Sequence, residues 1–164
     1  MQLKDWRRKQ PLMISDYLDA KNILFLEDQS RDETIKTLVH HLCKIYSLHD
    51  EKGFYDSVIE REKIVSTGIG RGVAIPHAKI DSLDDFVISI GILKNQGVEW
   101  NSLDKSLVRV VFLIGGPSID QKKYLKILSH LTNLLKEERF HEALFFYKDP
   151  EELLKIFRHY DRYL

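Results

Sequence analysis

The sequence predicts an α/β fold in which a mixed sheet of about five strands lies between helices on both faces. Two near-continuous apolar runs, 86–93 and 107–114, are typical of central strands that are covered on both sides. Segments with helical spacing of apolar residues lie before and after these runs. The expected order is helix, strand, two helices, three strands and three helices, which favours a sheet with helices on both faces.

The chain begins with a polar stretch. A chain of 164 residues is long enough for one buried core and short for two, so we expect a polar tail over 1–13 and one domain over 14–164. Within this division, the pattern predicts a short helix over 12–18 and a first strand over 22–26.

The clearest amphipathic helix of the first half follows that strand. Ser30 and Glu33 have the spacing of a capping box, and apolar residues continue at helical spacing to Ile45. A second helix is expected over 51–62. It would deliver Arg61 to the mouth of the glycine-rich segment that comes next.

The second half contains the two long strands and then three helices. Gly115, Gly116 and Pro117 are expected to end the second strand sharply. The next helix, over 120–135, places Tyr124 and a row of leucines on one side, and two shorter helices are expected over 137–146 and 150–160.

Composition excludes several classes of protein. With 25 basic and 25 acidic residues, the chain lacks the positive charge of a nucleic-acid-binding protein, and the basic group within 4–9 is expected to be solvated tail. Cys43 is the only cysteine, so neither an internal disulfide nor a cysteine-rich metal site is expected. The charged N-terminus and short apolar runs favour a cytoplasmic protein without membrane insertion.

The histidines do not form a metal-ligand pattern. His40 and His41 are adjacent, so they point in different directions on a helix. No spacing of histidine and carboxylate residues makes a ligand set elsewhere. We therefore expect neither a metal nor a cofactor.

The segment 66–79 differs in composition from the rest of the chain. It holds two hydroxyl residues, Ser66 and Thr67, and three glycines that each permit positive φ and close approach of backbone amides to a ligand: Gly68, Gly70 and Gly72. Such a composition is typical of an anion-binding loop. The rival interpretation is a plain glycine turn followed by a structural histidine.

The same segment ends in a histidine on a rigid backbone. Residues 73–75 form a short apolar run that suits a sheet, and Pro76 lacks the N–H that would extend the ladder. His77 follows directly. A neutral imidazole is nucleophilic near pH 7, and amides and a guanidinium can hold phosphoryl oxygens. The segment together with Arg61 therefore has the groups needed to accept a phosphoryl group on His77, with Ser66 and Thr67 as further donors.

These residues resemble a known family, the enzyme IIA domain of the bacterial phosphoenolpyruvate-dependent phosphotransferase system, in its fructose, mannitol and nitrogen-regulatory class. The resemblance extends from about Ile14 to about Tyr160. The motifs that carry it are Arg61-Glu62, Ser66-Thr67-Gly68-Ile69-Gly70, Gly72-Val73-Ala74-Ile75-Pro76-His77, Trp100, Asp104 and Pro117.

The resemblance implies a phosphoryl carrier with a mixed sheet between helices. His77 would accept the phosphoryl group from the histidine phosphocarrier protein, with Arg61 near the site. The group would then pass to a IIB domain, or the phosphorylation state would act as a signal to a regulated transporter or kinase.

The sequence departs from the family pattern at two positions. Members commonly have a second active-site histidine where this chain has Tyr124, and His130 lies roughly 120° around the helix from that position, which makes it a helix-flank residue and a poor substitute. A tyrosine can donate a hydrogen bond to a phosphoryl oxygen but does not become a cation. Arg71 stands where a small polar residue is common; it would attract an acidic partner or phosphoryl oxygens, or face water.

Two function classes follow. The first is a phosphotransferase-system carrier, for which a free-standing domain favours the nitrogen-regulatory type over a sugar-specific fructose or mannitol component. The second is a non-catalytic regulatory module that binds a partner protein and whose phosphorylation is weak or lost through the change at Tyr124.

Overall fold

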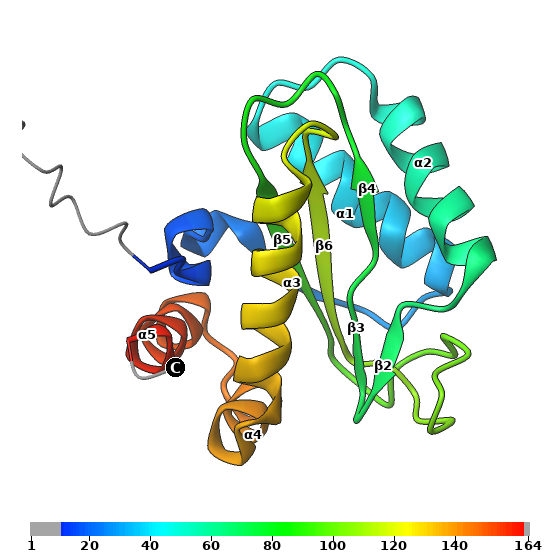
Figure 1. Ribbon diagram of the computed structural model, residues 1–164. Coiled ribbons are helices and arrows are strands. Elements are labelled where there is room, and N and C mark those ends of the chain that lie inside the picture. Colours follow the sequence, from blue (N-terminus) through cyan, green and yellow to red (C-terminus); the bar gives the residue numbers. More distant parts are fainter. Residues whose placement is uncertain (1–10, 163–164) are drawn as a thin grey trace, which may run out of the picture.

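A mixed β-sheet forms the centre of the molecule (Figure 1). The computed structural model describes residues 11–162, so the predicted tail over 1–13 lies mostly outside the described residues. Within them the sheet has six strands in the order β1-β5-β6-β3-β2, and β4 also pairs with β6. The strands are β1 (Ile23–Leu26), β2 (Gly68–Gly70), β3 (Val73–Ala74), β4 (His77–Lys79), β5 (Val87–Leu93) and β6 (Val110–Gly116).

The strand directions confirm that the sheet is mixed. β1 runs parallel to β5, β5 runs antiparallel to β6, and β3 and β4 both run parallel to β6. β2 is antiparallel to β3 at the edge. The sheet has one strand more than the expected five or so, because the glycine-rich segment supplies two short strands, β2 and β4, beside the predicted apolar run.

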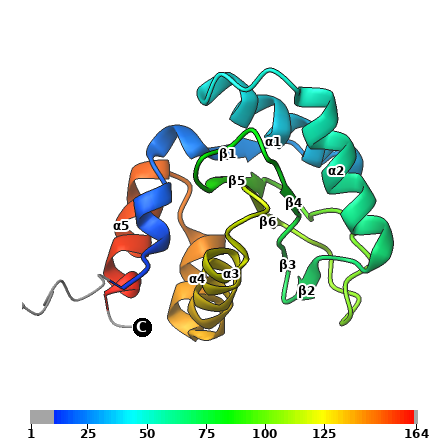
Figure 2. The same cartoon turned by 45° about the horizontal axis from the view of Figure 1, so that its top comes forward.

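Helices cover both faces of this sheet, as predicted (Figure 2). One face is covered by α1 (Arg31–Ile45) and α2 (Glu51–Ile64). The other is covered by α3 (Gln121–Lys136), α4 (Glu138–Phe146), α5 (Pro150–Asp161) and the short 3₁₀ helices η1 (Ile14–Tyr17) and η2 (Ala20–Asn22). Ser30, Asp50, Asp120 and Asp149 each accept a hydrogen bond from a first-turn amide, which explains where four of the α-helices begin.

The two central strands are buried along their whole length. Because neighbouring side chains of a strand point to opposite faces, Ile88, Ile90 and Phe112 pack under α3 and α5, while Val111 and Leu113 pack under α1 and α2. Each buried side chain of this size contributes about 1.5–3 kcal/mol relative to exposure. Burial on both faces is the physical reason for the continuous apolar runs in the sequence.

Two predicted boundaries are wrong. β6 does not stop before Gly115 but runs through Gly115 and Gly116. A Cβ on Gly116 would lie 2.2 Å from the ring of Phe86, so this position needs a glycine for packing. Packing, not strand termination, accounts for that glycine. The predicted first helix is only the single 3₁₀ turn η1, and its first amides, those of Ile14 and Ser15, donate to the carboxylate of Asp161.

Candidate active site

A break in the backbone at Pro76 positions His77. β3 ends at Ala74 and β4 begins at His77, and both strands pair with β6, so the two short strands form one interrupted edge of the sheet. At the break, the amide of Ile75 donates to the carbonyl of Thr67, which continues the pairing of β3 with β2. His77 is therefore held by strand pairing immediately after a proline, as the sequence predicted, and its side chain is partly exposed.

The imidazole of His77 has a defined tautomer. Its Nδ1 lies 2.8 Å from the carbonyl oxygen of Ile75. A carbonyl oxygen only accepts hydrogen bonds, so Nδ1 carries the proton and Nε2 keeps its lone pair. Burial lowers the pKa of His77, and the positive charge of Arg61 lowers it further, although the Ile75 carbonyl and Glu62 act in the opposite direction. The side chain is thus neutral near pH 7, with Nε2 as its nucleophilic atom.

A pocket of about 740 Å³ lies beside His77, where α2, β4 and the start of α3 meet. Polar and apolar side chains share its wall. They are Asp56, Ser57, Glu60, Arg61, Ile64, His77, Ala78, Lys79, Gln121, Tyr124 and Leu125. The structure therefore brings together three of the residues predicted for the site: His77, Arg61 and Tyr124. A second pocket, of about 530 Å³ between α1 and α2, contains none of these three residues.

Arg61 contributes a positive charge to the wall of this pocket, and not to the glycine turn at whose mouth it was expected. It lies in the last turn of α2, and its Nη1 donates to the carbonyl oxygen of Val65 over 2.9 Å. This bond uses one donor of a guanidinium that has five. Arg61 is accordingly placed to meet an anion bound on His77.

A buried carboxylate anchors the end of α2 next to Arg61. Glu62 is 4% exposed and accepts hydrogen bonds from the amide of Thr67 at 3.2 Å, from the Thr67 hydroxyl, and from Nε1 of Trp100 at 3.4 Å. These contacts join the helix to the chain entering β2 and to the loop after β5. Sequence reasoning gave Glu62 and Trp100 no role, although both belong to the family motif.

Tyr124 lies directly beside the imidazole. It is in the first turn of α3, its ring centroid is 5.3 Å from that of His77, and its ring also stacks on that of Phe86 with the centroids 5.9 Å apart. The Tyr124 hydroxyl is buried and has no hydrogen-bond partner within residues 11–162. Burial raises the pKa of Tyr124 well above its ordinary value, so the hydroxyl keeps its proton.

The hydroxyls predicted to hold a phosphoryl group point elsewhere. The Ser66 hydroxyl donates to the carbonyl of Trp100 and accepts from the amide of Gly68, and the Thr67 hydroxyl donates to Glu62. Neither residue is among those that line the pocket of His77. Ser66 and Thr67 act here as connections between α2, β2 and the Trp100 loop.

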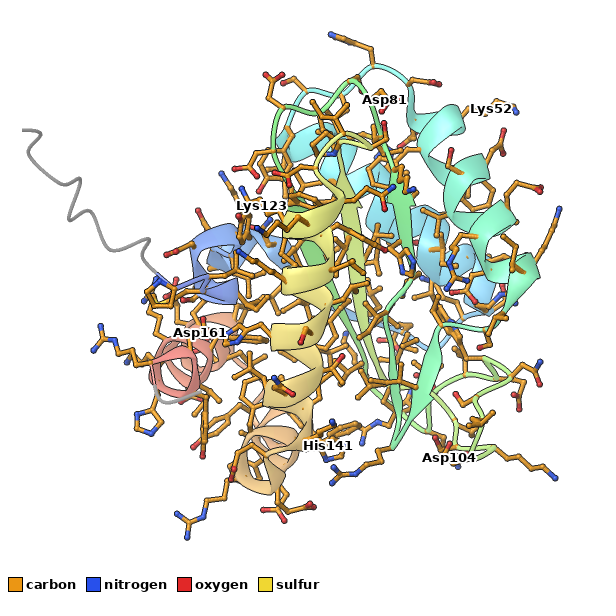
Figure 3. The ribbon with its side chains drawn as sticks, in the orientation of Figure 1. Lys52, Asp81, Asp104, Lys123, His141 and Asp161 are labelled. Atoms are coloured by element: carbon orange, nitrogen blue, oxygen red, sulfur yellow. The ribbon has the colours of Figure 1, made fainter. Side chains whose placement is uncertain are left out.

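The glycine turn is also separated from His77. Gly70, Arg71 and Gly72 all have positive φ and form the turn between β2 and β3, whereas Gly68 does not. This turn lies at the far end of the sheet from β4, near Asp104 and His141 (Figure 3). The amide of Arg71 donates to the Asp104 carboxylate over 2.8 Å, and the amide of Gly72 donates to the Ser106 hydroxyl.

The predicted cradle at Gly68, Gly70 and Gly72 is therefore corrected. The turn does bind an anion, but that anion is the carboxylate of Asp104 from the same chain. Hydrogen bonds from Arg71 and Ser106 lower the pKa of Asp104 to about 2. The glycines have a structural role at the sheet edge, as in the rival interpretation of that turn.

Arg71 and His130 also have partners within the chain. Nη2 of Arg71 lies 2.8 Å from Glu138, so this arginine joins the β2–β3 turn to α4 and does not face the pocket of His77. His130 is not simply a helix-flank residue, because its Nε2 lies 2.7 Å from Asp161, whose side chain is fully buried. His130 lines a different pocket from His77, which agrees with the prediction that it does not replace the second histidine.

Comparison with known families tests the resemblance. Residues 16–160 match the family model described as "Phosphoenolpyruvate-dependent sugar phosphotransferase system, EIIA 2". The chain belongs to this family. EIIA components of the phosphotransferase system are phosphoryl-transfer carriers, and the family has nitrogen-regulatory and sugar-specific members.

Relatives of both types resemble the chain. It is 32% identical over 152 residues to the fructose-specific EIIABC component of Bacillus subtilis, a match that covers 92% of this chain and 24% of that relative. The chain thus spans about a quarter of the length of that EIIA 2 relative.

Two solved structures have the same fold. The nitrogen regulatory protein IIA-Ntr of Neisseria meningitidis superposes with a TM-score of 0.81 at 25% identity, covering 88% of this chain and 98% of that one. The mannitol IIA enzyme of Escherichia coli, solved in complex with phosphorylated IIB, superposes with a TM-score of 0.72 at 22% identity, covering 87% and 97%. The predicted fold class is confirmed. Within residues 11–162, no helix has the length and apolar character to cross a membrane, and no three potential metal-ligating side chains gather.

Proposed function

We propose that this EIIA-family chain is a phosphohistidine carrier that accepts a phosphoryl group on Nε2 of His77 from the histidine phosphocarrier protein. The observation that carries the proposal is the neutral imidazole, fixed through Nδ1 on the Ile75 carbonyl, whose ring borders a pocket shared with Arg61. A fixed ring and a positive charge beside it suit phosphoryl transfer, in which positioning and electrostatic stabilisation do most of the work.

The transfer step balances without an additional proton carrier. The Nε2 lone pair of His77 forms a bond to phosphorus while the bond between phosphorus and the donor's histidine nitrogen breaks, and that electron pair returns to the donor nitrogen. Nδ1 of His77 keeps its proton and its bond to Ile75 throughout. The positive charge that develops on the ring is balanced by the phosphoryl oxygens.

Two features would stabilise the phosphoryl oxygens. Arg61 supplies N–H donors and a positive charge from α2. Gln121, the first residue of α3, lines the same pocket, so the N-terminal end of that helix, with its partial positive charge, faces the site. Both features favour the phosphorylated state of His77.

The likeness to IIA-Ntr supports the nitrogen-regulatory type, in which the phosphorylation state of His77 controls a transporter or kinase. A sugar-specific component that passes the group to a IIB domain is the second candidate. It is favoured by the fructose-specific relative and by the mannitol enzyme solved with phosphorylated IIB. Both versions place the chain in the cytoplasm, where the phosphocarrier protein would meet it.

Phosphorylation by purified components tests the proposal. The chain is incubated with labelled phosphoenolpyruvate, enzyme I and the histidine phosphocarrier protein, and acid-labile label is measured on the wild type, His77→Ala and His49→Ala. His49 is exposed and is the matched histidine control. We expect label on the wild type and on His49→Ala, and none on His77→Ala.

The other outcomes are equally informative. Label that persists in His77→Ala would move the site to another residue. A wild type that takes no label would favour the alternative, a non-catalytic module that binds a partner protein.

A further inference from the structure

The Tyr124 hydroxyl is a buried polar group without a hydrogen-bond partner among residues 11–162. Its oxygen is buried, and no residue of 11–162 donates to it or accepts from it. A buried hydroxyl without a hydrogen bond destabilises a protein, and such groups in native structures call for an explanation.

The surroundings of Tyr124 show which acceptor is missing. Its ring contacts both the ring of Phe86 and the imidazole of His77, and it borders the pocket that Arg61 also borders. The charged groups of that pocket are Asp56, Glu60 and Arg61 from α2 and Lys79 from β4, and Lys123 pairs with Asp85 beside Phe86. Asp56 pairs with Lys52 and Glu60 pairs with Lys63, so these two carboxylates already have cationic partners.

A phosphoryl group on His77 would bring three acceptor oxygens into this space. We infer that the Tyr124 hydroxyl donates a hydrogen bond to a phosphoryl oxygen on His77, so that the phosphorylated form satisfies a group which the unphosphorylated form leaves unpaired. The inference rests on the proposed function. Tyr124 is then a catalytic residue of this chain in its own right, acting as an uncharged donor where relatives commonly have a second histidine.

This role differs from a structural one in a measurable way. A structural tyrosine loses a hydrogen bond when it becomes phenylalanine, so the protein is destabilised. Tyr124→Phe instead removes an unpaired buried oxygen from the unphosphorylated protein, whose melting temperature should stay the same or rise. The loss should appear only when His77 carries its phosphoryl group.

The phosphoryl-exchange equilibrium measures that loss. Phosphorylated histidine phosphocarrier protein is mixed with the wild type, with Tyr124→Phe or with Tyr160→Phe, and the share of phosphoryl group on each protein is read at equilibrium. Tyr160 lies on α5, packs against Phe140 and loses the same single oxygen, which makes it the matched control.

We expect Tyr124→Phe to shift the equilibrium toward the donor by about tenfold, which corresponds to about 1.4 kcal/mol. Tyr160→Phe should leave the equilibrium constant within about twofold, because Tyr160 does not line the pocket of His77. An unchanged equilibrium in Tyr124→Phe, or a fall in its melting temperature without a change in the equilibrium, overturns the inference and leaves the carrier function standing. A wild type that takes no phosphoryl group overturns the carrier function itself.

Discussion

Replacing Arg61 by alanine separates the chemistry of the pocket from the stability of the fold. Among residues 11–162, the Arg61 side chain makes one hydrogen bond, from Nη1 to the Val65 carbonyl, and that bond is exposed to solvent. Its loss should lower the free energy of unfolding by at most about 0.5–1 kcal/mol. The same guanidinium is placed to donate to phosphoryl oxygens on His77, and a hydrogen bond to a charged group contributes about 1.5–3 kcal/mol.

Arg61→Ala should therefore slow phosphorylation of His77 by about tenfold to a hundredfold while the melting temperature changes little. The assay is the initial rate of acid-labile labelling from the phosphorylated phosphocarrier protein, with urea unfolding in parallel. Lys44→Ala is the control, because Lys44 is also a cation in the last turn of a helix, α1, but does not line the pocket of His77. Labelling of Arg61→Ala at the wild-type rate would refute the reasoning and reduce Arg61 to a helix-end contact.

Three further predictions test other parts of the structure. Gly70→Ala should lose about 1–2 kcal/mol of stability, because Gly70 has φ of 95° and a Cβ would lie 2.9 Å from Asp104. The rate at which His77 is labelled should equal that of the wild type. Slow labelling of a folded variant would mean that the glycine turn does take part in phosphoryl transfer. Asp161→Ala should lower the free energy of unfolding by about 3 kcal/mol, because it leaves the amides of Ile14 and Ser15 and the His130 ring without their acceptor. Folding lowers the pKa of Asp161, so this stabilisation is present above the unfolded pKa and is lost as the pH falls through the folded pKa. Urea unfolding at a series of pH values measures both effects. Folding lowers the pKa of His77 and so disfavours its protonation, and stability should therefore decline as the pH falls below the unfolded pKa near 6.5. For the same reason, labelling of His77 should persist to more acidic pH than a free imidazole allows. An NMR titration of His77 with a midpoint at or above 6.5 would contradict this.

Much of the fold could be predicted because it depends on local patterns. The apolar runs of β5 and β6 report burial on both faces, and the caps at Ser30 and Asp120 begin helices where the spacing of apolar residues also begins. The expected approach of Arg61 to His77 depended on the order of the chain. A helix ending near Arg61 and a strand beginning at His77 do meet at one pocket.

The glycine segment shows where such reasoning stops. Its turn has the backbone of an anion site, but the anion comes from Asp104, which is 33 residues away along the chain. The cluster of Glu62, Thr67 and Trp100 depends in the same way on a loop that follows β5. A local motif describes which hydrogen bonds a segment is able to make, and the distant parts of the chain decide which of them are already made.

The sequence by itself determined the class of fold, the family, and a histidine held after a proline beside an arginine, because composition, periodicity and motif spacing act over short stretches. Only the tertiary structure decided that Nδ1 of His77 is fixed on Ile75, that the amides of Arg71 and Gly72 in the glycine turn are occupied, and that the Tyr124 ring lies beside the imidazole with a buried hydroxyl that has no partner within residues 11–162. Those three facts depend on contacts between segments far apart in the chain, where burial and competition for hydrogen bonds, rather than residue type, set the chemistry.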